Sequence, residues 1–149
     1  MSEPVEFVLQ KEPFIVRRRA RWGECDPAGV VYTGNFTDFL ISAVMLFHET
    51  LMDGFVESNR KSLGIQTPCK SMSLVFNRAI WPNETFDMHV SVGEIRNSTY
   101  DIHVHAKLPD GTDVFSGVMT PVCIPLGQRK ATEIPASLRE KLEQFKTTP

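Results

Sequence analysis

The sequence predicts an α+β domain in which a curved antiparallel sheet of about five strands wraps around one long helix. Three features lead to this prediction: a strand-like stretch near the N-terminus, a long amphipathic stretch soon after it, and about four later stretches that alternate every second residue. Because these later stretches follow one another through short turns, the sheet is expected to be antiparallel. The helical stretch is so apolar that it needs a cover, which only the sheet could provide.

The first expected strand covers residues 14–22. Apolar residues occupy one face and arginines the other (Phe14, Val16, Ala20 and Trp22; Arg17, Arg19 and Arg21). Such a row of arginines could meet ligand phosphates, but it more often is solvated or pairs with acids of the next strand, and we expect the latter. Residues 1–13, before this strand, are expected to be a loose leader.

The long helix is expected to begin near Asn35 and to stop at Gly54. Its apolar residues recur at steps of three and four (Phe36, Phe39, Leu40, Ala43, Phe47 and Leu51). Asn35 followed by Asp38 resembles a helix cap with an acidic first turn, although the helix could start a residue or two earlier. His48 stands alone in this helix and is expected to be a packed or surface residue. A second, short helix is expected over residues 55–62.

The rest of the chain predicts strands and one terminal helix. The strands are expected over residues 70–78, 86–93, 100–108 and 114–125, with a tight turn at Pro109-Asp110-Gly111. A connector is expected over residues 66–69. Pro135 precedes a short helix over residues 136–145, with Leu138, Leu142 and Phe145 on one side.

Length and composition indicate one domain over residues 1–149 and exclude several functions. A net charge of −2 gives no reason to expect nucleic acid or an anionic membrane as a partner. The start of the chain lacks a signal peptide, and no apolar run approaches the roughly 20 residues of a membrane span. The odd number of widely spaced cysteines (Cys25, Cys69 and Cys123) suggests reduced thiols and a cytoplasmic location.

Motifs for other chemistries are absent or weak. The chain has no G-x-S-x-G nucleophile elbow and no glycine-rich nucleotide loop, so no cofactor is expected. Asp101, His103 and His105 share one strand face and could hold a metal, but a polar face or subunit contact is the more common use of such residues, and no metal is expected. Cys25 lacks an activating histidine nearby in sequence and is better explained as a small packed thiol.

The stretch from Trp22 to Phe36 holds the strongest candidate site. Asp26 lies between a cysteine and a proline, and Pro27 pushes it toward extended geometry. The long helix begins a few residues later, and its first amide N–H groups have no partner within the helix. A fixed carboxylate near a positive helix end suits chemistry on a carbonyl group. From these residues alone, however, a purely structural role for Asp26 in a turn is favoured.

A family resemblance changes this balance. The run Gly23-Glu24-Cys25-Asp26-Pro27-Ala28-Gly29-Val30-Val31-Tyr32, followed by Asn35-Phe36, resembles the signature of the 4-hydroxybenzoyl-CoA thioesterase family of hot-dog proteins. The resemblance implies a hot-dog fold, hydrolysis of an acyl-CoA thioester, and a homodimer or homotetramer with the site at a subunit interface. It assigns the catalytic carboxylate to Asp26 and the carbonyl-polarising backbone N–H to Thr33. Glu24 departs from the aspartate common in the family, with little effect expected.

The resemblance also implies where the substrate would be bound. Tyr32 and Gly34 are candidate substrate-binding residues beside the catalytic loop. In the family, a loop that corresponds to residues 96–98 contacts the nucleotide of coenzyme A, and only Arg96 keeps a positive charge there. Arg129 and Lys130 are alternative phosphate contacts. The acyl group stays open, because Phe36, Met45, Tyr32 and Met72 could line an aromatic or an aliphatic pocket or simply pack in the core.

Two other functions remain open. A hot-dog dehydratase acting on acyl thioesters would need a histidine paired with an acid near Asp26, and none is evident. A non-catalytic module that binds acyl-CoA or acyl-carrier protein would give Asp26 a structural role. Release of thiol from a panel of CoA esters separates the hydrolase from the binding module.

Overall fold

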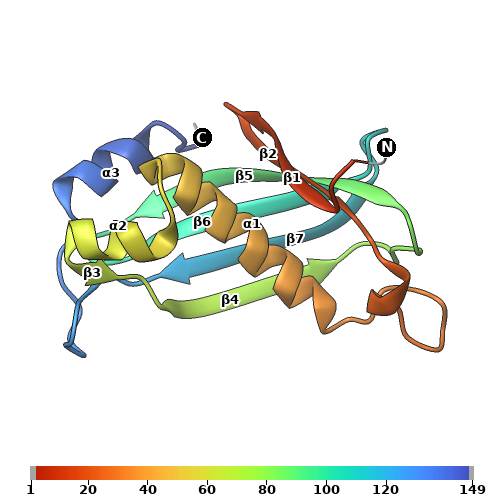
Figure 1. The fold of residues 1–149 in the computed structure, drawn as a ribbon, viewed down its shortest axis with the longest axis horizontal. Coiled ribbons are helices and arrows are strands. Elements are labelled where there is room, and N and C mark those ends of the chain that lie inside the picture. Colours follow the sequence, from red (N-terminus) through yellow and green to blue (C-terminus); the bar gives the residue numbers. More distant parts are fainter. Residues whose placement is uncertain (1–2, 148–149) are drawn as a thin grey trace.

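A computed structural model, which describes residues 3–147, shows one helix packed across a curved antiparallel sheet (Figure 1). The sheet has six strands in the order β1-β2-β5-β6-β7-β4, and every neighbouring pair is antiparallel. Helix α1 lies across one face of this sheet, and α2 and α3 lie at the end of the sheet where α1 finishes (Figure 1). This is the predicted α+β, hot-dog layout, with one strand more than expected.

The elements have the following bounds. The strands are β1 Glu6–Lys11, β2 Phe14–Arg19, β3 Ile65–Gln66, β4 Cys69–Phe76, β5 Thr85–Ile95, β6 Tyr100–Lys107, β7 Asp113–Pro121 and β8 Ile124–Pro125. The helices are the 3₁₀ turn η1 Trp22–Glu24, α1 Asn35–Met52, α2 Val56–Leu63 and α3 Ala136–Glu143.

The expectation of a loose leader over residues 1–13 is wrong for the described part of that segment. Glu6–Lys11 forms β1, which pairs with β2 and makes one edge of the sheet. Its side chains are only half-buried or exposed, so the segment lacks the apolar alternation that would mark a strand. Residues 1 and 2 lie outside the described residues.

Two strand ends also differ from prediction. The first expected strand stops at Arg19 instead of residue 22, and Trp22, expected on the apolar face, is 80% exposed in η1. The last expected strand divides into β7 and β8. Pro121 ends the first part, and Val122 forms an isolated bridge with Thr99. β8 then pairs with β3, which shares only Gln66 with the expected connector.

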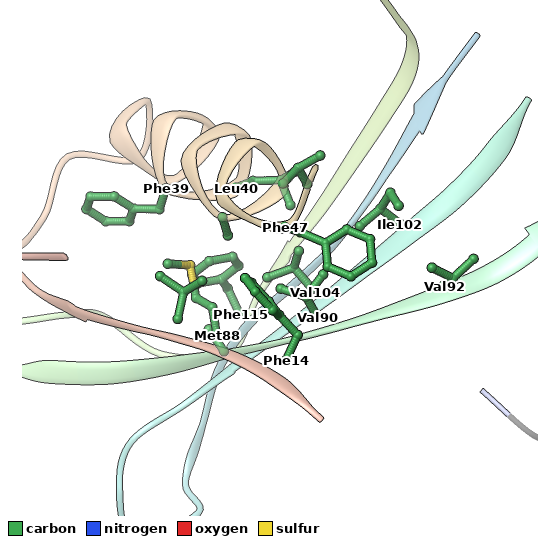
Figure 2. Close-up of a cluster of buried hydrophobic side chains, with 14 of the residues drawn as sticks. Phe14, Phe39, Leu40, Phe47, Met88, Val90, Val92, Ile102, Val104 and Phe115 are labelled. Atoms are coloured by element: carbon green, nitrogen blue, oxygen red, sulfur yellow. The ribbon is translucent and has the colours of Figure 1, made fainter. Parts of the chain in front are cut away.

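The core lies between α1 and the sheet (Figure 2). The expected apolar face of α1 is buried, and its aromatic rings meet those of the strands edge to face: Phe47 lies 5.3 Å from Phe14, and Phe36 lies 5.4 Å from Phe115. Gly117 in β7 permits this approach, because a Cβ atom there would lie 3.1 Å from the Leu40 side chain. Enlarging Gly117 would therefore push α1 away from the sheet.

Helix α1 begins at Asn35, as expected, and ends at Met52, where Asp53 adopts a left-handed conformation (φ 52°) one residue before the expected stop. Helices α2 and α3 and the tight turn at Gly111 (φ 94°) lie where predicted. Among the described residues no single helix is long and apolar enough to cross a membrane; α1 and α2 taken together would be, by length and composition, but they are bent by 54°.

Candidate functional site

The candidate site is the loop that carries the chain from β2 into α1. An antiparallel bridge between Cys25 and Val31 closes this loop, and the Asp26 N–H donates to the Val30 carbonyl at 2.9 Å. Gly29 completes the turn with a φ of 85°, a conformation that favours glycine, and its N–H donates to the Asp26 carbonyl at 2.9 Å. The tip of the loop is therefore fixed by its own backbone.

The Asp26 carboxylate is half-buried and uses one oxygen for the loop. Its Oδ1 accepts a hydrogen bond of 2.8 Å from the Ala28 N–H, the geometry of an Asx turn. Among the residues that the structure describes, none donates a hydrogen bond to Oδ2. The structural role foreseen for Asp26 is thus present, and it leaves one carboxylate oxygen available to a substrate or a water molecule.

Thr33 supplies a backbone donor at the other side of the same loop. The Tyr32 and Thr33 carbonyls already accept from the amides of Asn35 and Phe36, at 2.9 and 3.2 Å, as the chain turns into α1. By contrast, the Thr33 N–H donates to no backbone carbonyl within residues 3–147. An amide left over at the start of an 18-residue helix lies at the positive end of the helix dipole, where a developing oxyanion would be stabilised.

Tyr32 and Gly34 are in contact beside this donor. A Cβ atom built on Gly34 would lie 2.6 Å from Cε2 of Tyr32, so the tyrosine ring rests against the glycine. Tyr32 is 57% exposed despite its apolar ring. The structure therefore brings the sequence-predicted residues Asp26, Tyr32, Thr33 and Gly34 together in one loop, with an exposed aromatic ring at its surface.

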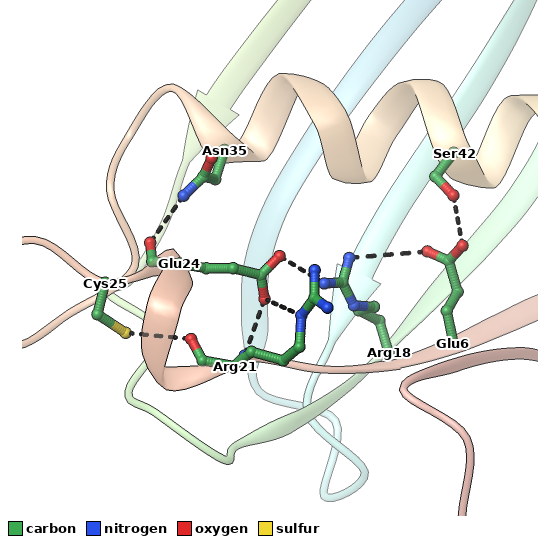
Figure 3. A network of polar contacts seen from close by, with 7 residues as sticks. All are labelled: Glu6, Arg18, Arg21, Glu24, Cys25, Asn35 and Ser42. Atoms are coloured by element: carbon green, nitrogen blue, oxygen red, sulfur yellow. Dashed lines mark hydrogen bonds and ion pairs between the residues drawn. The ribbon is translucent and has the colours of Figure 1, made fainter.

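A buried charge cluster ties this loop to the sheet (Figure 3). The Arg18 side chain is 8% exposed and lies between two acids, with Nη2 at 2.5 Å from Glu24 Oε2 and Nη1 at 3.9 Å from Glu6 Oε2. Its guanidinium also lies 4.6 Å from the Phe39 ring centre, in a cation–π contact. Glu6 in turn accepts a hydrogen bond from Ser42 of α1. We call Glu6, Arg18 and Glu24 the Arg18 cluster.

Glu24 connects this cluster to the start of α1. Its Oε1 accepts from the Arg21 N–H at 2.8 Å, and its carbonyl accepts from the Tyr32 N–H at 3.0 Å and from Asn35 Nδ2 at 2.7 Å. The expected helix-capping role of Asn35 is therefore wrong: the N-cap is Gly34, which makes no side-chain cap, and the Asn35 amide instead secures the loop.

Arg96 lies far from Asp26 within one chain. The Ala20 N–H, just after β2, donates to the Glu84 carbonyl at 2.9 Å, so the chain leaves β2 for the Asp26 loop beside the start of β5. Arg96 follows the other end of this 11-residue strand, about 33 Å away by strand rise. The Arg96 guanidinium is paired with Asp101, at 2.8 and 3.0 Å, and with Glu94, at 3.1 Å. The hydrogen bonds from Arg96 lower the pKa of Asp101. The alternative contacts Arg129 and Lys130 are exposed.

The other titratable candidates have structural partners. The Cys25 thiol lies 3.7 Å from the Arg21 carbonyl. Burial raises the pKa of this thiol, and the negative charges of Asp26 and Glu24 raise it further. A raised pKa argues against Cys25 as a nucleophile. Arg17 pairs with Asp87 of the next strand at 2.8 Å, as expected for the arginine row. Among the described residues no group of three His, Cys, Asp or Glu is arranged to hold a metal ion.

The sequence did not reveal the Arg18 cluster or the hydrogen bond between Tyr100 and His48. Arg18 lies on the same strand face as Phe14, Val16 and Ala20, because it is separated from each by an even number of residues. Its burial could therefore have been predicted from the two-residue period of the strand. Nothing in the sequence of β1 indicated that Glu6 would reach this arginine.

Comparisons with known proteins agree with this fold. The sequence profile of the Thioesterase-like superfamily matches residues 20–142. A thioesterase superfamily protein of Jannaschia has a similar structure (22% identity, TM-score 0.83, covering 99% of this chain and 100% of that one). A gentisyl-coenzyme A thioesterase is also similar (21%, TM-score 0.74, 86% and 98%), as is a 1,4-dihydroxy-2-naphthoyl-CoA thioesterase from Synechocystis (16%, TM-score 0.74, 87% and 94%).

Proposed function

The chain belongs to the thioesterase-like superfamily, and from this premise we propose that it hydrolyses an acyl-CoA thioester to a free acid and coenzyme A. Asp26 is the catalytic carboxylate and the Thr33 backbone N–H is the oxyanion donor. The observation that carries this proposal is that one backbone-fixed loop holds both Asp26 Oδ2 and the Thr33 N–H. Neither group has a hydrogen-bond partner among residues 3–147.

The chemistry needs only these groups and water. With Asp26 as general base, its carboxylate takes a proton from water as the water oxygen attacks the thioester carbonyl, and the carbonyl oxygen becomes negative beside the Thr33 N–H. Collapse of this intermediate breaks the C–S bond and releases the CoA thiolate, which takes up the proton. In the alternative route Asp26 attacks the carbonyl itself and displaces the CoA thiolate as the C–S bond breaks. Water then hydrolyses the mixed anhydride to the free acid and the Asp26 carboxylate, and its remaining proton goes to the thiolate.

The substrate contacts extend this proposal. Tyr32 and Gly34 flank the donor and would meet the thioester, while Arg96 would meet the CoA phosphates from a second subunit, since it lies too far from Asp26 in its own chain. A homodimer or homotetramer is therefore part of the proposal. The aromatic acyl groups in the names of two structural neighbours make aryl-CoA esters the first substrates to test.

The decisive experiment is thiol release from acetyl-, hexanoyl-, decanoyl- and benzoyl-CoA by the wild type and by Asp26→Asn. Asparagine keeps an amide oxygen that can accept from the Ala28 N–H, so the loop should persist while the charge is lost. We expect kcat to fall by about 10²-fold or more. The matched control is Asp38→Asn, an exposed acid in the first turn of α1, which should keep wild-type turnover.

The same assay addresses the alternatives. Binding of CoA esters by the wild type without thiol release would replace the hydrolase with an acyl-CoA or acyl-carrier-protein binding module. Wild-type turnover in Asp26→Asn would retain the hydrolase and remove Asp26 from its mechanism. The route by general base and the route by nucleophile differ in the fate of ¹⁸O from labelled water, which enters Asp26 after a single turnover only if an anhydride forms.

A further inference from the structure

The peptide unit that joins Tyr32 to Thr33 carries the proposed oxyanion donor, and Asn35 restrains this unit through two hydrogen bonds. The Asn35 N–H donates to the Tyr32 carbonyl at 2.9 Å. The Asn35 side chain donates from Nδ2 to the Glu24 carbonyl at 2.7 Å. Because a peptide unit is planar and trans, its N–H and C=O point in opposite directions. A hydrogen bond that fixes the Tyr32 carbonyl therefore also fixes the direction of the Thr33 N–H.

The Glu24 carbonyl closes these contacts into a ring. Besides the Asn35 side chain it accepts from the Tyr32 N–H at 3.0 Å, and a carbonyl oxygen has two lone pairs for two such donors. The ring runs from Glu24 to Tyr32, on to Asn35, and through the Asn35 side chain back to Glu24. Figure 3 shows this last link. It is the one hydrogen bond of the ring that a side chain makes, so a substitution can open the ring there and leave both backbone hydrogen bonds possible.

Glu24 is a fixed point for this ring, whereas the donor itself lies in exposed backbone. The Glu24 N–H donates to the Arg21 carbonyl at 2.9 Å, and the Glu24 carboxylate is bonded to Arg18 and to the Arg21 N–H. Thr33 and Gly34 are exposed, and Gly34 gives the backbone more freedom than any other residue would. The direction of the Thr33 N–H therefore depends on the ring that connects it to Glu24.

Helix formation does not account for the asparagine at position 35. Asn35 is the first residue of α1, and the helix has no side-chain cap. Leucine and alanine have a higher helix propensity than asparagine. The feature of the Asn35 side chain that neither of these residues can replace is its hydrogen bond to the Glu24 carbonyl.

We propose that Asn35 is a positioning residue for the reaction: its side-chain amide, bonded to the Glu24 carbonyl, aims the Thr33 N–H at the carbonyl oxygen of the thioester. The inference rests on the proposed function, which makes the Thr33 N–H the oxyanion donor. Asn35 acts through this donor and does not itself touch the substrate. A displacement of about 1 Å in a catalytic group can lower a rate by about 10²-fold, so kcat is the quantity that should respond.

The first test is Asn35→Leu, which keeps approximately the shape of asparagine and removes the donor. We expect kcat on the best CoA ester to fall by about 10- to 100-fold while KM stays within about threefold, because the oxyanion donor is displaced but not lost. Asp38→Leu makes a similar exchange at an exposed position of the same helix and should keep wild-type kcat. Asn35→Ala repeats the measurement with a smaller side chain in case leucine prevents folding. Wild-type kcat in the folded variants would overturn the proposal.

The second test distinguishes aiming of the Thr33 N–H from general support of the loop. In the Thr33→Pro background the N–H is already absent, so Asn35→Leu should change kcat by less than about threefold there. A residue that supports the fold in general would lower kcat by the same factor in both backgrounds. Equal factors would therefore overturn the role of Asn35 as a positioning residue.

The third test measures the direction of the Thr33 N–H without turnover, by residual dipolar couplings in protein labelled with ¹⁵N-threonine. The Thr33 signal is identified by its loss in Thr33→Ala. Asn35→Leu should change the Thr33 coupling, whereas Thr85 and Thr120, which lie in strands, should keep theirs. Asp38→Leu should leave all of these couplings unchanged.

The couplings keep failure of this inference distinguishable from failure of the proposed function. An unchanged Thr33 coupling in Asn35→Leu would overturn the inference even in an active hydrolase. A changed coupling in a protein that releases no thiol would support Asn35 as the residue that directs this N–H, and would remove the hydrolysis instead.

Discussion

The two ends of α1 hold polar groups of opposite character. At the N-terminal end the Arg18 cluster is charged and largely buried, and it fastens strands β1 and β2 to the loop that carries Asp26. At the C-terminal end His48 and Tyr100 form a neutral pair that faces a cavity. Buried charge is costly unless it is paired, whereas a neutral pair can border an apolar space with little penalty.

This difference indicates what each end is built for. The charged cluster fixes a backbone, because an ion pair with several directional contacts holds a loop in one position. The neutral pair brings no charge of its own to the mainly apolar cavity that it faces. The cluster that positions the Asp26 loop and the cavity beside His48 thus lie at opposite ends of a helix about 27 Å long. Four changes test this separation, in order of decreasing expected effect.

The largest effect should come from Thr33→Pro, which removes the backbone N–H proposed as the oxyanion donor. Loss of one such donor typically lowers kcat by about 10²–10³-fold, or about 2.7–4 kcal/mol. Thr33→Ala keeps the N–H and should retain turnover within about threefold, since the proposed contact uses the backbone alone. Steady-state kinetics on the best CoA ester measures both variants, and an equal loss in both would assign the effect to the side chain.

Next in size is Glu24→Ala, which takes one acid from the buried Arg18. Breaking a buried ion pair typically costs about 3–5 kcal/mol, and the remaining Glu6 at 3.9 Å reduces this to about 2–3 kcal/mol in the free energy of unfolding. Urea denaturation measures this loss. Glu24→Gln keeps an acceptor for the Arg21 N–H and should lose less. Equal stability of all three proteins would show that the cluster does not hold the loop.

A smaller effect is expected from the neutral pair, through pH. The pKa of His48 is lowered from 6.5 to about 4 by burial, so the unfolded chain binds more protons between these values. Stability should therefore fall by about 2 kcal/mol as the pH drops from 7 to 5. His48→Gln should remove that part of the pH dependence, whereas His103→Gln, at an exposed position, should retain it. Identical slopes for the two variants would contradict a neutral His48.

The smallest change should follow Gly34→Ala. Its φ of −61° suits alanine, and the three atoms nearest to the new Cβ all belong to the exposed Tyr32 ring, which can rotate away. The free energy of unfolding should change by less than about 1 kcal/mol. If Tyr32 contacts the substrate, as proposed, KM should rise two- to fivefold while kcat holds. A KM equal to that of the wild type would remove Tyr32 from the substrate contacts.

Much of the fold could be predicted because its elements have regular periods. The apolar residues of α1 and the alternation in β5 and β6 describe buried faces, and the structure buries them. The prediction failed where burial is incomplete. β1 is half-exposed and carries no two-residue period, and Trp22 has an apolar side chain that nevertheless lies outside the sheet.

The candidate site was predictable for a different reason. Asp26, Tyr32, Thr33 and Gly34 lie within nine residues of the sequence, so one loop brings them together. The groups that support this loop, Glu6 and Arg18, come from two strands, and their meeting depends on strand pairing that the sequence did not reveal. Arg96 illustrates the same limit, because its distance from Asp26 follows from the length of β5.

The pairing of β1 with β2 makes residues 6–11 part of the support for the loop that carries Asp26. Deleting residues 1–11 would strip Arg18 of Glu6, release Ser42 from its acceptor, and expose the hydrogen-bonding edge of β2 to other molecules. A bulky fusion placed directly before Glu6 would disturb the same contacts. Recombinant versions of this protein should accordingly carry their affinity tags at the opposite terminus.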